Sequence, residues 1–182
     1  MKTTIKKLAI ELNKSNILWG LGGSAMLSHY QKIDSVNDID ILIDEQDAEE
    51  VKSIFHKVAK KEKAISKEPF ATKYFFKYKY GNNFIDVMGG FQIYHEKGLY
   101  TMDFDQDSIT NYMYLDDISV PLSSLEDWYI LYALIPGKQY KAELIEVYWK
   151  ENGIRNPAII KRALQKPLPG YLVNNLQRFA ML

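Results

Sequence analysis

Residues 17–43, ILWGLGGSAMLSHYQKIDSVNDIDILI, decide the fold. The apolar run Ile17-Leu18-Trp19 and the glycines that follow it predict a strand and a tight turn, and then a helix from Ser24 to about Gln31. From Val36 to Ile43, apolar and acidic residues alternate with the two-residue period of a β-strand. The stretch therefore predicts a strand, a glycine turn, a helix and a second strand with one acidic face.

Two aspartates give the second strand its acidic face. Asp38 and Asp40 are two residues apart, so both side chains project from one face, with Cα atoms ~6.6 Å apart at ~3.3 Å rise per residue. Neighbouring carboxylates repel each other, and a pair of divalent cations would neutralise them. Oxygen ligands without nearby His or Cys favour Mg²⁺ or Mn²⁺ over zinc. A solvated strand, with Ile39, Ile41 and Ile43 turned inward, explains the alternation equally well.

The turn Gly22-Gly23-Ser24 lies between the first strand and the helix. Free backbone N–H groups and a hydroxyl at this place suit phosphate oxygens, although a Gly-Gly pair often makes only a tight turn. The turn and the acidic strand occupy successive elements of the chain. Together they indicate a phosphate cradle beside a two-metal carboxylate site, which is the arrangement that nucleotidyl transfer needs.

A third acid, Asp86, occurs in the otherwise apolar segment Phe84–Met88. This segment and Lys73–Tyr80 flank Gly81-Asn82-Asn83, a pattern that predicts a β-hairpin. An unpartnered carboxylate among apolar neighbours is energetically costly. We therefore expect Asp86 to bind a metal ion or to form an ion pair.

These residues resemble the DNA polymerase β-like nucleotidyltransferase superfamily, and in particular its small prokaryotic minimal and antibiotic-modifying types. The pattern of that family joins Gly-Gly or Gly-Ser to two acids separated by one apolar residue. Here Gly23-Ser24 is followed by thirteen residues and then by Asp38-Ile39-Asp40. The family also has a third carboxylate on a later strand, which Asp86 would supply. The resemblance covers roughly residues 15–135 and implies a nucleotidyltransferase-like mixed β-sheet flanked by helices.

The resemblance implies transfer of a nucleoside monophosphate from a nucleoside triphosphate, ATP for example, to a hydroxyl of an unidentified acceptor, with release of pyrophosphate. The acceptor would be a small molecule, a protein or RNA. Asp38 and Asp40 would hold two Mg²⁺ ions, with Mn²⁺ as an alternative, while Asp86 would complete the acceptor-side metal site and receive the hydroxyl proton. The residues expected to contact phosphate or substrate are Gly22, Gly23, Ser24, Lys138 and Lys141. For the two lysines, a solvated helix face is the alternative.

The rest of the chain is mixed at first and helical afterwards, which predicts an α+β fold with an α/β core at 1–122 and a helical C-terminal segment at 123–182. A capping box, Ser123 to Glu126, predicts the start of the first of these later helices. Residues 91–117 are polar and weakly periodic, which is typical of loops with short strands. The further helices are expected at about 5–12, 47–58 and 139–150, and beyond Pro157 with an interruption at 167–170.

The composition of the 182 residues is that of an ordinary globular protein, with 47% hydrophobic and 25% charged residues. Equal numbers of basic and acidic residues, 23 each, argue against a protein that coats nucleic acid or membrane. The absence of cysteine excludes disulfides and thiolate chemistry. No apolar stretch approaches the ~20 residues of a membrane span, so we expect a cytoplasmic protein without a signal peptide.

Two other functions stay open at this point. Relatives of the family often have an Arg or Lys in the helix after Gly-Ser, where residues 25–30 of this chain have neither, and many have a serine where this chain has Asn37. A degenerate member that binds nucleotide or a partner without turnover is therefore one alternative. The toxin half of a toxin–antitoxin pair is another. Lysines and aromatic residues interleave in 73–80, but an ordinary hairpin explains that pattern, so nucleic acid is a less favoured partner. The alternating acids at 103–107 predict a surface role, and the oligomeric state is not fixed by the sequence.

Overall fold

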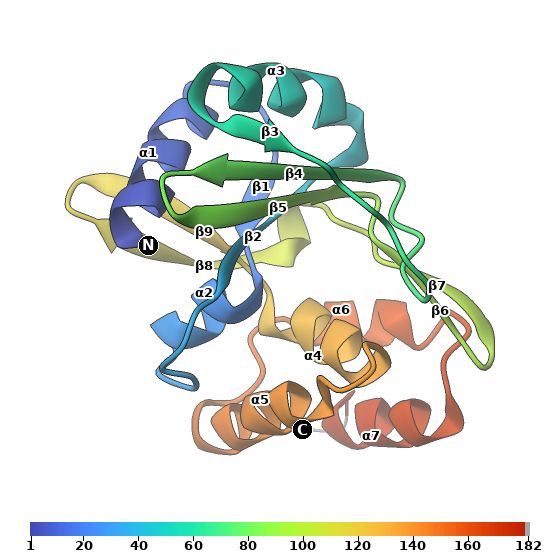
Figure 1. The fold of residues 1–182 in the computed structure, drawn as a ribbon. Coiled ribbons are helices and arrows are strands. Elements are labelled where there is room, and N and C mark those ends of the chain that lie inside the picture. Colours follow the sequence, from blue (N-terminus) through green and yellow to red (C-terminus); the bar gives the residue numbers. More distant parts are fainter. Residues whose placement is uncertain (181–182) are drawn as a thin grey trace.

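The structure is a computed structural model that describes residues 1–180, and it shows a mixed β-sheet with helices on both faces and a helical C-terminal part (Figure 1). The α+β class expected from the sequence is confirmed. The helices are α1 (Lys2–Leu12), α2 (Gly23–His29), α3 (Ala48–Val58), α4 (Leu125–Leu134), α5 (Gln139–Asn152), α6 (Pro157–Ala163) and α7 (Gly170–Ala180), with 3₁₀ turns η1 (Glu45–Asp47) and η2 (Gln106–Ser108). The strands are β1 (Trp19–Leu21), β2 (Asp38–Ile43), β3 (Lys60–Glu62), β4 (Tyr74–Tyr80), β5 (Asn83–Gly89), β6 (Gln92–His95), β7 (Gly98–Thr101), β8 (Ile109–Leu115) and β9 (Ile118–Ser123).

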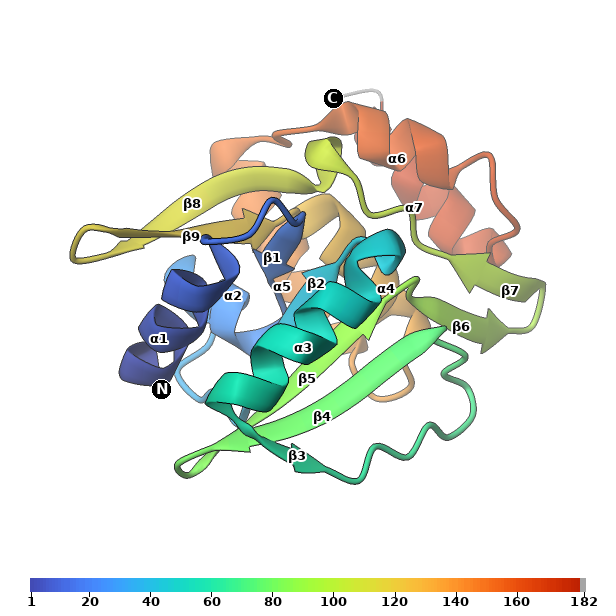
Figure 2. The same cartoon turned by 90° about the horizontal axis from the view of Figure 1, so that it is seen from above.

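Seven strands form the main sheet, in the order β3-β4-β5-β2-β1-β9-β8. Two neighbouring pairs are parallel, β2 with β5 and β1 with β9, and the other pairs are antiparallel. Strands β6 and β7 make a separate hairpin that extends from one side of the molecule (Figure 2). Because β2 lies in the middle of the main sheet, its apolar residues, Ile39 and Ile41–Ile43, are buried, while both of its aspartates stay partly accessible.

Helices α1 and α3 cover one face of the main sheet, and α2 and the C-terminal helices lie on the other side (Figure 1). In α1, Ile5, Leu8 and Leu12 form the buried stripe that their helical spacing predicts. In α3, Phe55 packs against Tyr78 of β4, with ring centroids 4.8 Å apart. These contacts leave the opposite face of the sheet free to form a site with the C-terminal helices.

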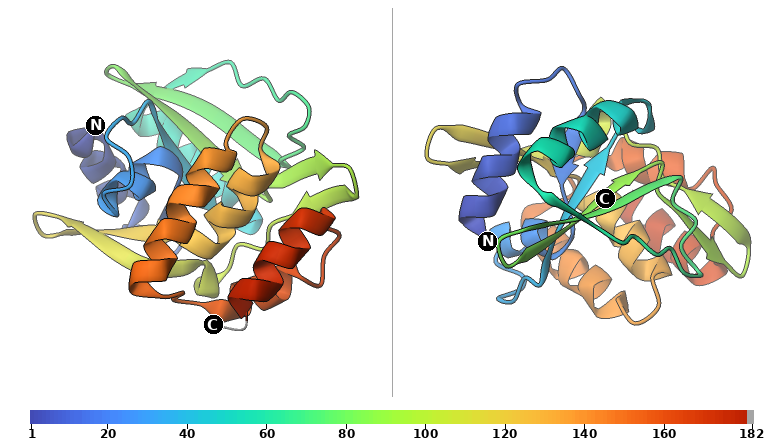
Figure 3. Two further views of the ribbon diagram at one scale, coloured as in Figure 1. Left: turned by 90° about the horizontal axis from the view of Figure 1, so that it is seen from below. Right: turned by 45° about the horizontal axis from the view of Figure 1, so that its top comes forward.

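Helix α4 lies at the centre of the C-terminal helices, between the sheet and α5 and α6 (Figure 3). All ten of its residues are buried, which is unusual because most helices keep one polar face in solvent. Its side chains belong to the same continuous hydrophobic core as those of β2 and α1. The proposed boundary between 1–122 and 123–182 lies one residue before the end of β9, just ahead of α4, and as a domain boundary it stays a prediction.

The predicted N-cap of α4 was wrong by one residue. The cap is Ser124, whose hydroxyl accepts a hydrogen bond from the Asp127 N–H at 3.0 Å and donates one to the Asp127 carboxylate at 2.6 Å. Ser123 is instead the last residue of β9, because its hydroxyl donates to the Leu21 carbonyl at 2.8 Å and is thereby fixed to the sheet. Glu126, the expected capping acid, accepts backbone hydrogen bonds at the start of α6.

The sequence pattern also missed parts of the sheet. The lysine run after α3 forms the edge strand β3, and the region 91–117 contains β8, a seven-residue strand of the main sheet. The short strands expected in that region are present as β6 and β7. The first strand lies at Trp19–Leu21, slightly beyond the apolar run that predicts it. The hairpin of β4 and β5 is confirmed. Within residues 1–180, no helix has both the length and the apolar character that crossing a bilayer requires.

Candidate active site

Three carboxylates meet at the centre of the main sheet. Asp38 and Asp40 lie on β2 and Asp86 lies on β5, and one carboxylate oxygen from each is within 4.8 Å of the others. The parallel register of these strands pairs Asp40 directly with Asp86, which places the two side chains on the same face. The structure thus brings together the three acids that the sequence singled out, and we call them the acidic triad.

The charges of the acidic triad are poorly compensated. Burial, together with repulsion from Asp38 and Asp86, raises the pKa of Asp40 to about 8, and the ammonium groups of Lys141 and Lys77 only partly oppose these effects. Burial also raises the pKa of Asp86, against the effect of its hydrogen bond from Lys77. A divalent cation would remove this repulsion, and a set of carboxylate oxygens fits Mg²⁺ or Mn²⁺.

The glycine turn lies directly against the acidic triad. Gly23 has a φ of +58°, a left-handed conformation that favours glycine, and a Cβ at this position would overlap the Asp40 carboxylate. A Cβ at Gly22 would overlap the Trp128 indole. The Gly22 N–H donates to the backbone carbonyl of Asp40 at 2.8 Å, so this N–H fixes the turn to β2 and is already occupied. Of the three residues of the turn that were expected to contact phosphate, Gly23 and Ser24 therefore remain available for that contact.

Lys141 joins the C-terminal helices to the glycine turn. Its Nζ donates to Ser24 Oγ at 2.5 Å and lies 5.1 Å from the centre of the Tyr132 ring. The side chain is buried, and this burial lowers the pKa of Lys141. Lys138, at the N-cap of α5, is exposed and lines the same pocket. Lys141 therefore does not lie on a solvated helix face, whereas the exposed Lys138 is free to reach a ligand.

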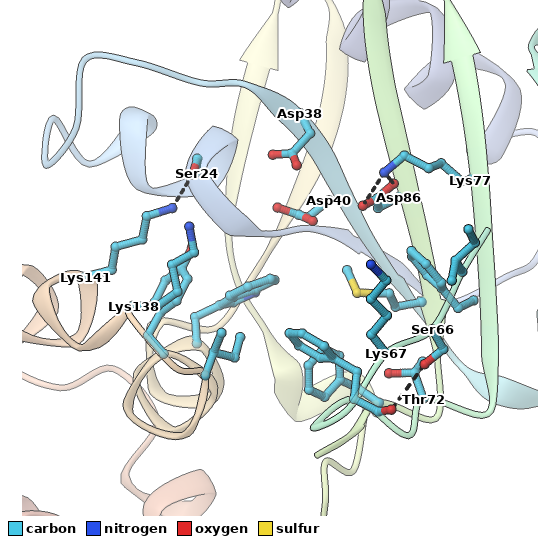
Figure 4. A pocket seen from close by; sticks show the side chains of 18 of the residues that line it. Ser24, Asp38, Asp40, Ser66, Lys67, Thr72, Lys77, Asp86, Lys138 and Lys141 are labelled. Carbon is cyan, nitrogen blue, oxygen red and sulfur yellow. Dashed lines mark hydrogen bonds and ion pairs between the residues drawn. The ribbon is translucent and has the colours of Figure 1, made fainter. Parts of the chain in front are cut away.

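These groups line one pocket of about 610 Å³ between the sheet and the C-terminal helices (Figure 4). Ser24, Lys138 and Lys141 lie at one end, and the acidic triad lies in the middle. At the other end, Lys77 extends from β4, and Lys67 comes from the segment that precedes this strand. The pocket therefore has basic side chains on both sides of its carboxylates.

Sequence reasoning missed Lys77 as a residue of the site. Its ammonium group donates to both oxygens of Asp86, at 2.8 and 3.1 Å. The hairpin register pairs Tyr80 with Asn83 and therefore Lys77 with Asp86. Placing the two-residue turn of the hairpin at Gly81-Asn82 would have been enough to predict this ion pair from the sequence. Once the turn is known, the residues that face each other on the two antiparallel strands are fixed.

Two aromatic residues of α4, Trp128 and Tyr132, also line the pocket. Trp128 supports the glycine turn, and its indole N–H donates to Ser123 Oγ at 2.7 Å. Tyr132 is buried, and within residues 1–180 its hydroxyl has no hydrogen-bond partner. Burial raises the pKa of Tyr132, as do the nearby Asp40 and Asp38, so the hydroxyl is a neutral donor beside the acidic triad.

Comparison with known proteins gives a fold but no close relative. No protein-family model matches the chain, and no curated protein sequence matches it. Among solved structures, a candidate nucleotidyltransferase from Thermotoga maritima, TM1012, is 24% identical with a TM-score of 0.61, and the match covers 82% of this chain and 92% of that one. The chain therefore has the fold that the resemblance to nucleotidyltransferases implies.

The antibiotic-resistance factor ANT(2″)-Ia has a similar fold. Its solution structure is 15% identical to this chain with a TM-score of 0.54, over 98% of this chain and 91% of that one. Its crystal structure in complex with adenylyl-2″-tobramycin is 13% identical with a TM-score of 0.56, over 88% and 97% of the two chains. The similarity thus extends from the sheet into the C-terminal helices.

Proposed function

We propose that this protein is an enzyme that transfers a nucleoside monophosphate from a nucleoside triphosphate to a hydroxyl group and releases pyrophosphate. One observation carries the proposal: three carboxylates within reach of a single metal ion lie in the same pocket as the Ser24–Lys141 pair. This combination offers ligands for a divalent ion and, beside them, hydrogen-bond donors for phosphate oxygens. The nucleotidyltransferase fold supports the same reaction class.

Each residue of the pocket has its own part in the proposed transfer. Bound at the acidic triad, two Mg²⁺ ions, or Mn²⁺ in their place, would supply positive charge next to the transferring phosphate. Ser24 and Lys141, together with Lys138, bind the two phosphates that leave as pyrophosphate. Asp86 takes the proton of the acceptor hydroxyl while the oxygen of that hydroxyl forms its bond to the α-phosphorus. The bond from the α-phosphorus to its bridging oxygen breaks, and its electron pair leaves with pyrophosphate.

The proposed partners are a nucleoside triphosphate, with ATP as the first candidate, and a small-molecule acceptor. The complex of ANT(2″)-Ia with adenylyl-2″-tobramycin, a structure of similar fold, supports a small-molecule acceptor. The pocket volume of about 610 Å³ lies within the ~300–1,000 Å³ range of small-molecule sites. A cytoplasmic location belongs to the proposal, since nucleoside triphosphates are available there.

A screen with α-labelled nucleoside triphosphates tests this function. The protein is incubated with Mg²⁺, each of the four ribonucleotides and a small-molecule extract, and both pyrophosphate and labelled product are measured. We expect one preferred nucleotide and a product that disappears with EDTA and in the Asp38→Asn variant. Equal labelling by the wild-type protein and this variant would contradict the proposal.

A nucleotide-binding protein without turnover is the second candidate. It is favoured by one observation, the pairing of both Asp86 oxygens with Lys77, because this pairing competes with any other role of Asp86. Calorimetric titration of the preferred nucleotide separates the two functions. Mg²⁺-dependent binding without pyrophosphate release, with acceptor extract present, would favour the binding protein.

A further inference from the structure

The two ends of the pocket are chemically different, and the reaction geometry assigns a role to each. In an in-line displacement, the attacking and leaving oxygens lie on opposite sides of the transferred phosphorus. Ser24 and Lys141, assigned to the leaving phosphates, lie on one side of the acidic triad, and Lys77 and Lys67 lie on the other (Figure 4). The acceptor must therefore approach from the side of β4 and residues 63–75. We call this part of the pocket the acceptor end.

The acceptor end is basic. Lys63, Lys67 and Lys77 line it, and Asp86 is the one acid among the described residues that line it. Lys77 is paired with Asp86, whereas Lys63 and Lys67 form no ion pair within residues 1–180. Two divalent ions and a bound triphosphate would roughly cancel each other's charge. Lys77, Lys138 and Lys141 would balance the three carboxylates of the acidic triad, so Lys63 and Lys67 would remain in excess, in a chain whose formal net charge is zero.

The acceptor end also has an apolar wall. Among its lining residues, Phe91 and Met88 are buried, while Phe70 and Ile65 remain 37% and 56% exposed. The rings of Phe70 and Phe91 meet edge to face, with centroids 6.2 Å apart. Phe75 extends the same apolar surface. Exposed apolar side chains around a pocket indicate contact with an apolar part of a ligand.

We propose that the acceptor is a small hydroxyl compound that carries an anionic group, phosphate or carboxylate, on a flat apolar body. This inference rests on the proposed function, because that function defines which end receives the acceptor. The anionic group pairs with Lys63 and Lys67 at the rim, and the flat body lies on Phe70 and Phe75. A polycationic acceptor is disfavoured, since it would meet three lysines and no carboxylate apart from the acidic triad.

Four ring compounds that differ in charge test the proposal. The protein is loaded with Mg²⁺ and a non-hydrolysable ATP analogue, which fills the phosphate end, and is titrated with phenyl phosphate, benzoate, benzyl alcohol and benzylamine by NMR. We expect phenyl phosphate or benzoate to bind at least ~10-fold more tightly than benzyl alcohol, and benzylamine to bind most weakly. The comparison of phenyl phosphate with benzoate shows which anion the rim prefers.

Charge-reversal variants place the effect at the acceptor end. The double variant Lys63→Glu and Lys67→Glu should lose the preference for the anions, whereas Lys60→Glu and Lys61→Glu, exposed on β3 outside the pocket, should retain it. Equal binding of all probes, tighter binding of benzylamine, or an anion preference that survives in the first double variant overturns the inference. Failure of the wild-type protein to bind the ATP analogue overturns the proposed function and, with it, this inference.

Discussion

The sequence contains two runs of alternating aspartates, at 38–40 and at 103–107, and the two runs have opposite environments. At Asp38-Ile39-Asp40 the strands bring in a third acid, and the pKa of Asp40 rises to about 8. At Asp103-Phe104-Asp105 the C-terminal helices bring in cations: Arg162 bonds to Asp105 at 2.5 Å and Lys166 bonds to Asp103 at 2.6 Å. We call this second group, which also includes the buried Asp127, the Arg162 cluster.

The difference between the two groups lies in the cations that the fold supplies. Lys77 is bonded to Asp86 and Lys141 to Ser24, and within residues 1–180 Asp38 and Asp40 form no ion pair. The Arg162 cluster meets its cations within the protein, so its exposed acids stabilise the contact of α6 with the loop before η2. Alternating aspartates therefore indicate a metal site only where the rest of the fold leaves them without cations.

The largest expected effect contrasts one acid from each group. Asp40→Asn should lower the rate of pyrophosphate release by ~1,000-fold or more, because it removes a carboxylate that would hold the metal ions beside the transferring phosphate. Asp105→Asn should leave the rate within a few fold of wild type, because its partner is Arg162. Steady-state rates of the two purified variants test the contrast, and equal losses in both would remove the distinction between the groups.

Arg162→Ala tests the structural role of the second group. It removes the cation shared by Asp103, Asp105 and the buried Asp127, so we expect a loss of ~2–3 kcal/mol in the free energy of unfolding. Lys73→Ala is the matched control, because its ion pair with Glu45 is exposed and should contribute ~0–1 kcal/mol. Urea unfolding followed by circular dichroism measures both, and similar losses would show that Arg162 forms an ordinary surface contact.

The pH dependence of the free energy of unfolding tests the environment of Asp127, the buried acid of the Arg162 cluster. Burial raises its folded-state pKa to about 7, against the hydrogen bond from Ser124 and the charge of Arg162, whereas the ordinary value is 3.8. The folded state therefore holds the proton more tightly than the unfolded state, and this group reduces stability as the pH rises from about 4 to about 7. Asp127→Asn should remove up to ~1.4 kcal/mol per pH unit of that slope. Urea unfolding between pH 4 and 8 measures it, and identical slopes for both proteins would contradict the assignment.

The smallest effect expected is a thermal one. Without metal, Asp40→Asn should raise the melting temperature by a few °C, because the substitution relieves repulsion within the acidic triad. Mg²⁺ should raise the melting temperature of the wild-type protein and not that of the variant. Differential scanning fluorimetry with EDTA or Mg²⁺ tests both statements, with Asp103→Asn as the control that retains the Mg²⁺ response.

The sequence predicted the parts of the site that depend on local pattern. These local signals are the period-two alternation of β2, the glycine turn and the hairpin of β4 and β5. The structure brings together the acids of β2 and β5. Pairing across the fold was not predictable in the same way. The bond from Lys141 to Ser24 spans 117 residues, and the contact of Trp128 with Gly22 depends on how α4 enters the core.

The strand errors have a related cause. Strand β3 consists of two lysines and a glutamate, and it forms because β4 offers an unpaired edge rather than because of its own propensity. The one-residue error in the cap of α4 arises because Ser123 and Ser124 have the same local signal. The hydrogen bond from Ser123 to Leu21, a tertiary contact, distinguishes them.

The complete burial of α4 has a consequence for how the protein is made. During synthesis the sheet emerges first, but the residues that cover its site-bearing face come from α4 and from α5 and α6, which surround α4. Until about the last third of the chain has left the ribosome, that face of the nascent sheet is without its apolar cover. A chain that stops short of α6 should therefore aggregate or recruit chaperones rather than persist as a stable, partly folded protein.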